Sequence, residues 1–111
     1  MKKIMLVCSG GMSTSLLVNI MNEEVKKYDE EIEIFASPEA EAQKMIEQVD
    51  VVLLGPQVFY IVSEFKEFAR PFNIPIAVID AIDYGRMDGE KVLKMGLQLI
   101  NENRKETGKN E

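Results

Sequence analysis

The chain has 111 residues, and 46% of them are hydrophobic, which suits one compact domain with a continuous core. Its formal net charge of -6 argues against nucleic acid or an anionic membrane surface as a partner, because both need clustered Lys and Arg. The sequence contains no histidine, which excludes histidine-based catalytic triads, histidine-ligated metals and phosphohistidine on this chain.

Four short apolar runs predict β-strands. The first, third and fourth runs are almost continuously apolar, as in parallel strands that are covered on both faces. The second run alternates between apolar and polar residues, which is typical of a half-exposed edge strand. The predicted strands cover residues 4–7, 31–36, 51–55 and 76–80.

A segment of helical length follows each predicted strand. The second helix has a start signal, with Ser37 as its N-cap and Pro38 at its first helical position. Asp88 is expected to be the N-cap of the last helix. The other predicted helices cover roughly residues 13–28 and 58–69, and the last ends near residue 103.

This alternation of strands and helices predicts a single α/β domain of three layers, in which helices flank a four-stranded parallel sheet of order 2-1-3-4. The order creates a topological switch point where the first and third strands end, at Cys8 and Gly55. Ligands of such sheets bind at this point. We expect the domain to span residues 1–103 and residues 104–111 to form a frayed tail.

Cys8 is the only cysteine, and it opens the loop "CSGGMSTS" between the first strand and the first helix. Gly10 and Gly11 let successive backbone N–H groups converge, and the start of the helix adds unpaired donors and a partial positive charge. The hydroxyls of Ser9, Ser13, Thr14 and Ser15 are further donors. The loop therefore predicts an anion site that stabilises a thiolate and then holds a phosphoryl group without a metal. The alternative, that Cys8 is a small buried residue at a strand end, explains the glycines and hydroxyls less well.

Low-molecular-weight tyrosine phosphatases, whose fold is similar to the one predicted here, also place a cysteine after the first strand. Their loop reads C-x-x-x-x-x-R-S/T, whereas this chain has Thr14 at the arginine position. Without the guanidinium group, the loop lacks the fork that neutralises transition-state charge. We therefore expect poor hydrolysis and favour a long-lived thiophosphate that is passed to a second partner.

Three motifs, "CSGGMSTSLLV", "DVVLLGPQ" and "VIDAIDYGRMDG", resemble those of the enzyme IIB component of the lactose/cellobiose (diacetylchitobiose) family of the bacterial sugar phosphotransferase system. The resemblance spans residues 3–103. It implies a phosphocarrier without cofactor or metal, in which Cys8 accepts a phosphoryl group from a phosphohistidine on the IIA protein. Cys8 then donates the group to a β-linked disaccharide, of cellobiose or chitobiose type, that is bound by the membrane component IIC. The precise sugar stays open. The single cysteine and the lack of a signal-peptide pattern or an apolar run of 18 residues favour the cytoplasm, and nothing in the sequence demands more than a monomer.

The resemblance also assigns the contacts to the phosphoryl oxygens. They come from the backbone and hydroxyls of the loop, with Met12 contributing its backbone. The phosphoryl-binding residues implied in this way are Ser9, Gly10, Gly11, Met12, Ser13, Thr14 and Ser15.

Two further motifs follow the third and fourth strands. Gln57, in "GPQVFY", either touches the phosphoryl group or a partner, or belongs to a strand-to-helix turn with Pro56 at the helix start and Tyr60 in the core. In "DYGRMDG", Tyr84 and Arg86 are expected on a partner-facing rim, although Arg86 also fits a solvated loop residue.

Three alternatives to the carrier remain open. The first is a phosphatase-like enzyme, which Thr14 disfavours. The second is a non-catalytic interaction domain in which Cys8 is inert. The third, a metal or receiver pocket at Asp80 and Asp83, is weak because Cys8 stands where a receiver needs acidic residues.

Overall fold

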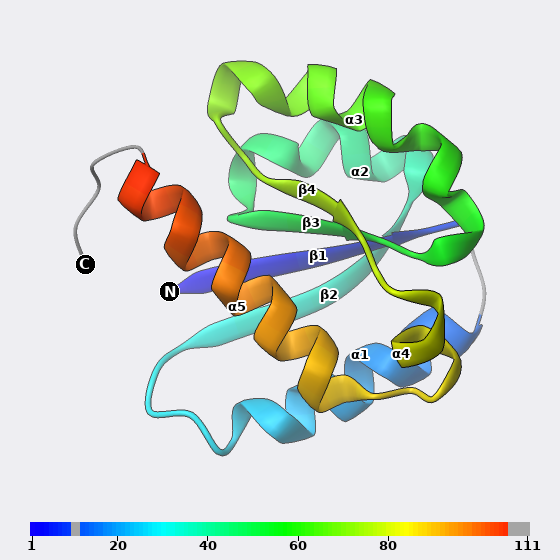
Figure 1. Ribbon diagram of the computed structural model, residues 1–111, viewed down its shortest axis with the longest axis vertical. Helices are drawn as coiled ribbons and strands as arrows, with labels where there is room; N and C mark the ends of the chain where they lie inside the picture. Colours follow the sequence, from blue (N-terminus) through cyan, green and yellow to red (C-terminus); the bar gives the residue numbers. More distant parts are fainter. Residues whose placement is uncertain (10–11, 107–111) are drawn as a thin grey trace.

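The computed structural model describes residues 1–9 and 12–106, and it confirms the predicted parallel sheet of order β2-β1-β3-β4 (Figure 1). All three neighbouring strand pairs are parallel, and Leu6 in β1 lies between Ala36 of β2 and Leu53 of β3. The strands are β1 (Lys2–Cys8), β2 (Ile32–Pro38), β3 (Val51–Leu54) and β4 (Ile76–Val78).

Helices cover both faces of the sheet, as Figure 1 shows. One face carries α1, α4 and α5, and the other carries α2, α3 and the 3-10 helix η2. The α-helices are α1 (Met12–Val25), α2 (Glu39–Met45), α3 (Val62–Ala69), α4 (Ala81–Gly85) and α5 (Gly89–Glu106), and the 3-10 helices are η1 (Ile46–Gln48), η2 (Pro56–Ile61) and η3 (Arg70–Phe72). No helix in the described part of the chain is both long enough and apolar enough to cross a membrane.

The continuous apolar run of β1 is explained by this double cover. Successive side chains of a strand point to opposite faces, so Ile4 and Leu6 join the core cluster under α1 and α5, whereas Met5 and Val7 join the cluster under α2 and α3. All four side chains are fully buried. The sheet therefore separates two apolar cores. Strand β1 contributes side chains to both of them, and this burial on two sides fixes the position of β1.

The predicted start of the second helix is wrong. Ser37 and Pro38 belong to β2, where Pro38 pairs with Cys8, and α2 begins only at Glu39 without a side-chain cap. Pairing with β1 continues to the end of that strand and keeps Ser37 buried and extended. Proline is tolerated there because β2 is an edge strand.

The region from residue 56 to residue 69 also differs from the predicted single helix. It is divided into η2 and α3, with non-helical backbone angles at Val58. As a result, Phe59 and Tyr60 lie on the surface, and Tyr60 is 65% exposed rather than in the core.

The last helix extends beyond the predicted boundary at residue 103. Helix α5 continues to Glu106, and Arg104 forms an ion pair of 3.6 Å with Asp50, the residue just before β3. Of the predicted tail, residues 107–111 lie outside the described residues. The N-cap prediction is confirmed, because the Asp88 carboxylate accepts a hydrogen bond from the Lys91 N–H at 3.2 Å.

Candidate active site

The candidate site lies where β1, β3 and β4 end. Cys8 is the last residue of β1 and is partly exposed. The end of β3 lies beside the end of β1, because the Gly55 N–H donates to the Val7 carbonyl oxygen at 2.9 Å. We call this end of the molecule the strand-end face, and define it by Cys8 and Ser9, Met12–Leu16, Gly55–Tyr60 and Asp80–Arg86. The loops of these segments lie together in Figure 1.

Helix α1 begins at Met12, four positions after Cys8. The N–H groups of Met12, Ser13 and Thr14 belong to the first turn and have no acceptor within the helix. The helix dipole adds a partial positive charge at the same end. A helix start of this kind can hold an anion without a basic side chain.

The first turn of α1 is tied to α4 by the phenol of Tyr84. The Tyr84 Oη lies 2.7 Å from the Thr14 Oγ1 and 2.9 Å from the Ser13 Oγ, both within hydrogen-bond distance. Tyr84 is only 5% exposed and Thr14 only 2%, whereas Ser13 is on the surface. The Tyr84 ring also packs near Gly55, because a Cβ at that glycine would lie 3.8 Å from the Tyr84 Cε2. Tyr84 thus spans from the end of β3 to the start of α1.

This location corrects the expected role of Tyr84 on a partner-facing rim. Its ring belongs to the buried core cluster under α1 and α5, so the side chain supports the strand-end face from beneath. Similarly, Thr14 is not open to solvent, and its hydroxyl is engaged with Tyr84.

Helix α4 is held in place by its own N-cap. The Asp80 Oδ1 accepts hydrogen bonds from the Ile82 N–H at 2.8 Å and from the Asp83 N–H at 3.3 Å. The Asp83 carboxylate lies 3.9 Å from the Lys91 ammonium group. Both carboxylates therefore have structural partners, and residues 1–9 and 12–106 contain no group of three or more His, Cys, Asp or Glu arranged for a metal ion.

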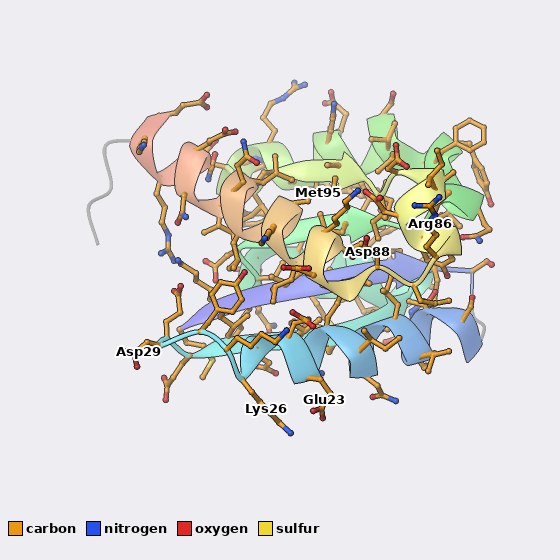
Figure 2. The ribbon with its side chains drawn as sticks, turned by 60° about the horizontal axis from the view of Figure 1, so that its bottom comes forward. Glu23, Lys26, Asp29, Arg86, Asp88 and Met95 are labelled. Atoms are coloured by element: carbon orange, nitrogen blue, oxygen red, sulfur yellow. The ribbon has the colours of Figure 1, made fainter. Side chains whose placement is uncertain are left out.

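The other predicted site residues are distributed as follows. Gln57 is exposed, and its Oε1 would lie 3.1 Å from a Cβ at Gly55, so its side chain lies over the end of β3. Arg86 is exposed in the turn after α4 (Figure 2). Ser9 and Ser15 are exposed beside the start of α1. Two predicted residues, Gly10 and Gly11, and the side chain of a third, Met12, lie outside the described residues.

Sequence reasoning missed α4 and the hydroxyl cluster. The helix had a local signal, because Asp80 is followed three positions later by Asp83, a spacing typical of a helix start. The cluster had none, since Tyr84 is 70 positions from Thr14.

A four-stranded parallel α/β domain with a cysteine at its strand-end face is the class of protein defined so far, and comparisons with known proteins specify the family. The model of the family described as "PTS system, Lactose/Cellobiose specific IIB subunit" matches residues 3–95. The chain therefore belongs to this family of the sugar phosphotransferase system (PTS), whose members are phosphotransferases that work with IIA and IIC components.

Two curated relatives match over nearly their whole length. The chain is 44% identical over 100 residues to the oligo-beta-mannoside-specific EIIB component of Bacillus subtilis, covering 90% of this chain and 97% of that protein. It is 40% identical over 105 residues to the cellobiose-specific EIIB component of Lactococcus lactis, with the same coverage of 90% and 97%.

A solved structure is similar in fold and sequence. The solution structure of the cellobiose-specific IIB component from Borrelia burgdorferi is 38% identical, with a TM-score of 0.77, and the match covers 92% of this chain and 94% of that one. The role of this chain in sugar-specific phosphotransfer follows from these relationships.

Proposed function

We propose that Cys8 is the nucleophile that carries the phosphoryl group, and that it acts between a phosphohistidine on the IIA protein and a sugar bound by the membrane component IIC. The single observation that supports this most directly is the position of Cys8. It is the only thiol of a histidine-free chain, it ends β1 at the strand-end face, and a helix begins four positions later. The hydroxyls of Ser9, Ser13 and Ser15 at the same face are weaker nucleophiles than a thiolate.

In the first transfer, the Cys8 thiolate sulfur attacks the phosphorus of the phosphohistidine. A P–S bond forms and the P–N bond breaks, and its electron pair stays on the imidazole nitrogen of the IIA protein. In the second transfer, a sugar hydroxyl oxygen attacks the phosphorus, the P–S bond breaks, and Cys8 leaves as a thiolate. The sugar hydroxyl gives its proton to a base of the IIC component or to water. Both steps depend on alignment more than on acid-base chemistry by this chain.

The phosphoryl oxygens would be bound by the loop after Cys8. We assign this role to the backbone N–H groups and hydroxyls of residues 9–15. Helix starts favour anions through unpaired N–H groups and through their dipole, and neutral donors hold a phosphoryl group without a basic side chain. Because Thr14 is buried against Tyr84, its contribution would come from its backbone N–H.

The residue at position 14 also favours phosphoryl transfer to a partner over hydrolysis. A buried threonine replaces the arginine that clamps the phosphoryl group in the phosphatase loop. We therefore expect the thiophosphate to persist long enough to reach an acceptor. The proposed acceptor is a β-linked disaccharide of cellobiose or chitobiose type, and the protein is proposed to act as a cytoplasmic monomer.

The proposal is tested by intact mass spectrometry after mixing with a phosphorylated IIA protein of the cellobiose type. Wild type is expected to gain one phosphoryl group, and Cys8→Ala is expected to gain none while keeping the same circular dichroism spectrum. Cys8→Ser tests whether the weaker hydroxyl nucleophile replaces the thiol. An adduct that survives in Cys8→Ala would place the chemistry elsewhere, and release of phosphate without a wild-type adduct would indicate a phosphatase.

A further inference from the structure

The hydroxyl groups of Thr14, Tyr84 and Ser13 form a chain of hydrogen bonds. Tyr84 is the central member, with Oγ1 of Thr14 at 2.7 Å and Oγ of Ser13 at 2.9 Å. Ser13 and Thr14 are adjacent in the first turn of α1, and Tyr84 belongs to α4. One phenol therefore contacts two neighbouring side chains of the proposed phosphoryl-binding loop.

Counting protons determines how this chain is arranged. Each of the three hydroxyl groups has one hydrogen to donate, and the two contacts use two of them. The third hydrogen needs an acceptor elsewhere, because a buried hydroxyl that donates to nothing carries a desolvation cost. Thr14 and Tyr84 are 2% and 5% exposed, whereas Ser13 is exposed. The unpaired hydrogen is least costly on Ser13.

Either oxygen of each pair can donate, and the difference in exposure favours the direction Thr14 to Tyr84 to Ser13. In that direction, Thr14 would donate to the Tyr84 oxygen and Tyr84 to the Ser13 oxygen, which would leave the Ser13 hydrogen to donate outward. A hydroxyl that already accepts a hydrogen bond is a stronger donor, because successive hydrogen bonds polarise one another. Ser13 is thereby prepared for an acceptor at the strand-end face, and a phosphoryl oxygen is an acceptor only.

We propose that Tyr84 is a positioning residue for phosphoryl transfer, which acts by orienting and polarising the Ser13 hydroxyl toward the phosphoryl group on Cys8. This inference rests on the proposed function, since it assigns a donor to the same site. Tyr84 does not touch the phosphoryl group itself, because it lies beneath the first turn of α1. The Asp80 carboxylate caps α4, which carries Tyr84, and the Tyr84 ring lies near Gly55.

The first test is Tyr84→Phe, which removes the Oη and keeps the ring. The transfer rate from phosphorylated IIA at saturating donor is expected to fall by about 10- to 100-fold, the size of one hydrogen bond to a charged group. The KM for IIA should stay within about twofold of wild type, because Tyr84 is buried and offers the donor protein no contact. Tyr28→Phe is the matched control: Tyr28 packs against the other end of α5, so the same atom is lost there without effect on transfer.

The second test is a double-mutant cycle with Ser13→Ala. If Tyr84 acts through Ser13, then Tyr84→Phe should add almost nothing to the loss caused by Ser13→Ala. Additive losses would overturn the proposal, because Tyr84 would then support the fold independently of Ser13. Thr14→Val, which removes the first donor of the chain and keeps the shape, should give a smaller loss than Tyr84→Phe, and thermal unfolding must show that each variant is folded.

The outcomes separate this inference from the proposed function. If wild type gains no phosphoryl group, the carrier mechanism itself fails. If wild type is phosphorylated on Cys8 and Tyr84→Phe transfers at the wild-type rate, the carrier mechanism stands and the role of Tyr84 is refuted.

Discussion

The Asp80 carboxylate supports the candidate site indirectly, by stabilising a helix that carries one of its residues. Its side chain caps α4 through the N–H groups of Ile82 and Asp83, and α4 carries Tyr84. A five-residue helix has little stability of its own, because most of its N–H and C=O groups belong to its ends. The position of the Tyr84 phenol therefore depends on this cap.

Replacing the cap tests this dependence. Asp80→Ala is expected to lower the free energy of unfolding by about 1 kcal/mol, the usual cost of losing an N-cap. The rate of phosphoryl transfer should also fall, because Tyr84 is then held less firmly. Asp80→Asn keeps an oxygen acceptor at the same place and should retain most of both properties. Urea denaturation and transfer from phosphorylated IIA measure the two effects, and equal losses in both variants would show that the negative charge, rather than the cap, matters.

At the scale of elements, α5 joins α1 through a very close contact. A Cβ at Gly89 would lie 2.7 Å from the Ile20 Cγ2 and 3.2 Å from backbone atoms of Ile20 and Met21. The start of α5 therefore rests on the α1 backbone itself, with no space for a side chain. Since α1 also carries the first turn beside Cys8, this contact helps to fix the position of the site.

Two glycine substitutions measure the value of this contact. Gly89→Ala is expected to lower the free energy of unfolding by about 1–3 kcal/mol, because α1 and α5 must separate to admit the methyl group. Gly85→Ala is the matched control, since a Cβ at Gly85 meets no atom within 4 Å. It should leave stability unchanged or raise it slightly, by reducing the entropy of the unfolded chain. Chemical denaturation distinguishes the two, and equal effects would contradict the close packing.

Helices and strands were predictable from the sequence wherever burial alone determines the pattern of apolar residues. Val51–Leu54 is a continuous apolar run because both faces of β3 are covered, and a run of this kind is visible without a structure. Ser37 was misassigned because its local signal is that of a helix cap, whereas pairing between β2 and β1 extends the strand past it. A short helix such as α4 falls below the length at which hydrophobic periodicity can be detected.

The position of Cys8 in the sheet was predictable from the sequence, whereas the contacts between side chains around it were not. The strand order placed Cys8 beside the end of β3 because parallel sheets have few permitted connections. The partnership of Tyr84 with Ser13 and Thr14 was not predictable, because it depends on how α4 folds back over α1. Local sequence patterns contain no information on contacts between residues so far apart.

At the scale of the whole molecule, large apolar side chains are exposed around the strand-end face. They come from three separate elements, α1, η2 and α4, that surround Cys8. The exposed members are Leu16, Phe59, Tyr60 and Ile82. The proposed IIA and IIC partners must bring their reacting atoms to Cys8, and apolar surface of this kind is what such contacts bury.

This surface is tested by Phe59→Ser, at a site where the ring is 61% exposed. The KM for phosphorylated IIA is expected to rise by about tenfold, with little change in the rate at saturating donor, because only docking loses a contact. Phe72→Ser is the control, since Phe72 is 44% exposed but lies in η3, before the start of β4 and thus at the opposite end of the sheet. Equal KM values for the two variants would show that IIA docks elsewhere.

The presence of one thiol at one face has a kinetic consequence for uptake. Under the proposed mechanism the donor and the acceptor react at the same sulfur, so the IIA protein must leave before the IIC component can arrive. A surface that held its donor too tightly would slow transport, which favours a small apolar contact area that binds quickly and releases quickly.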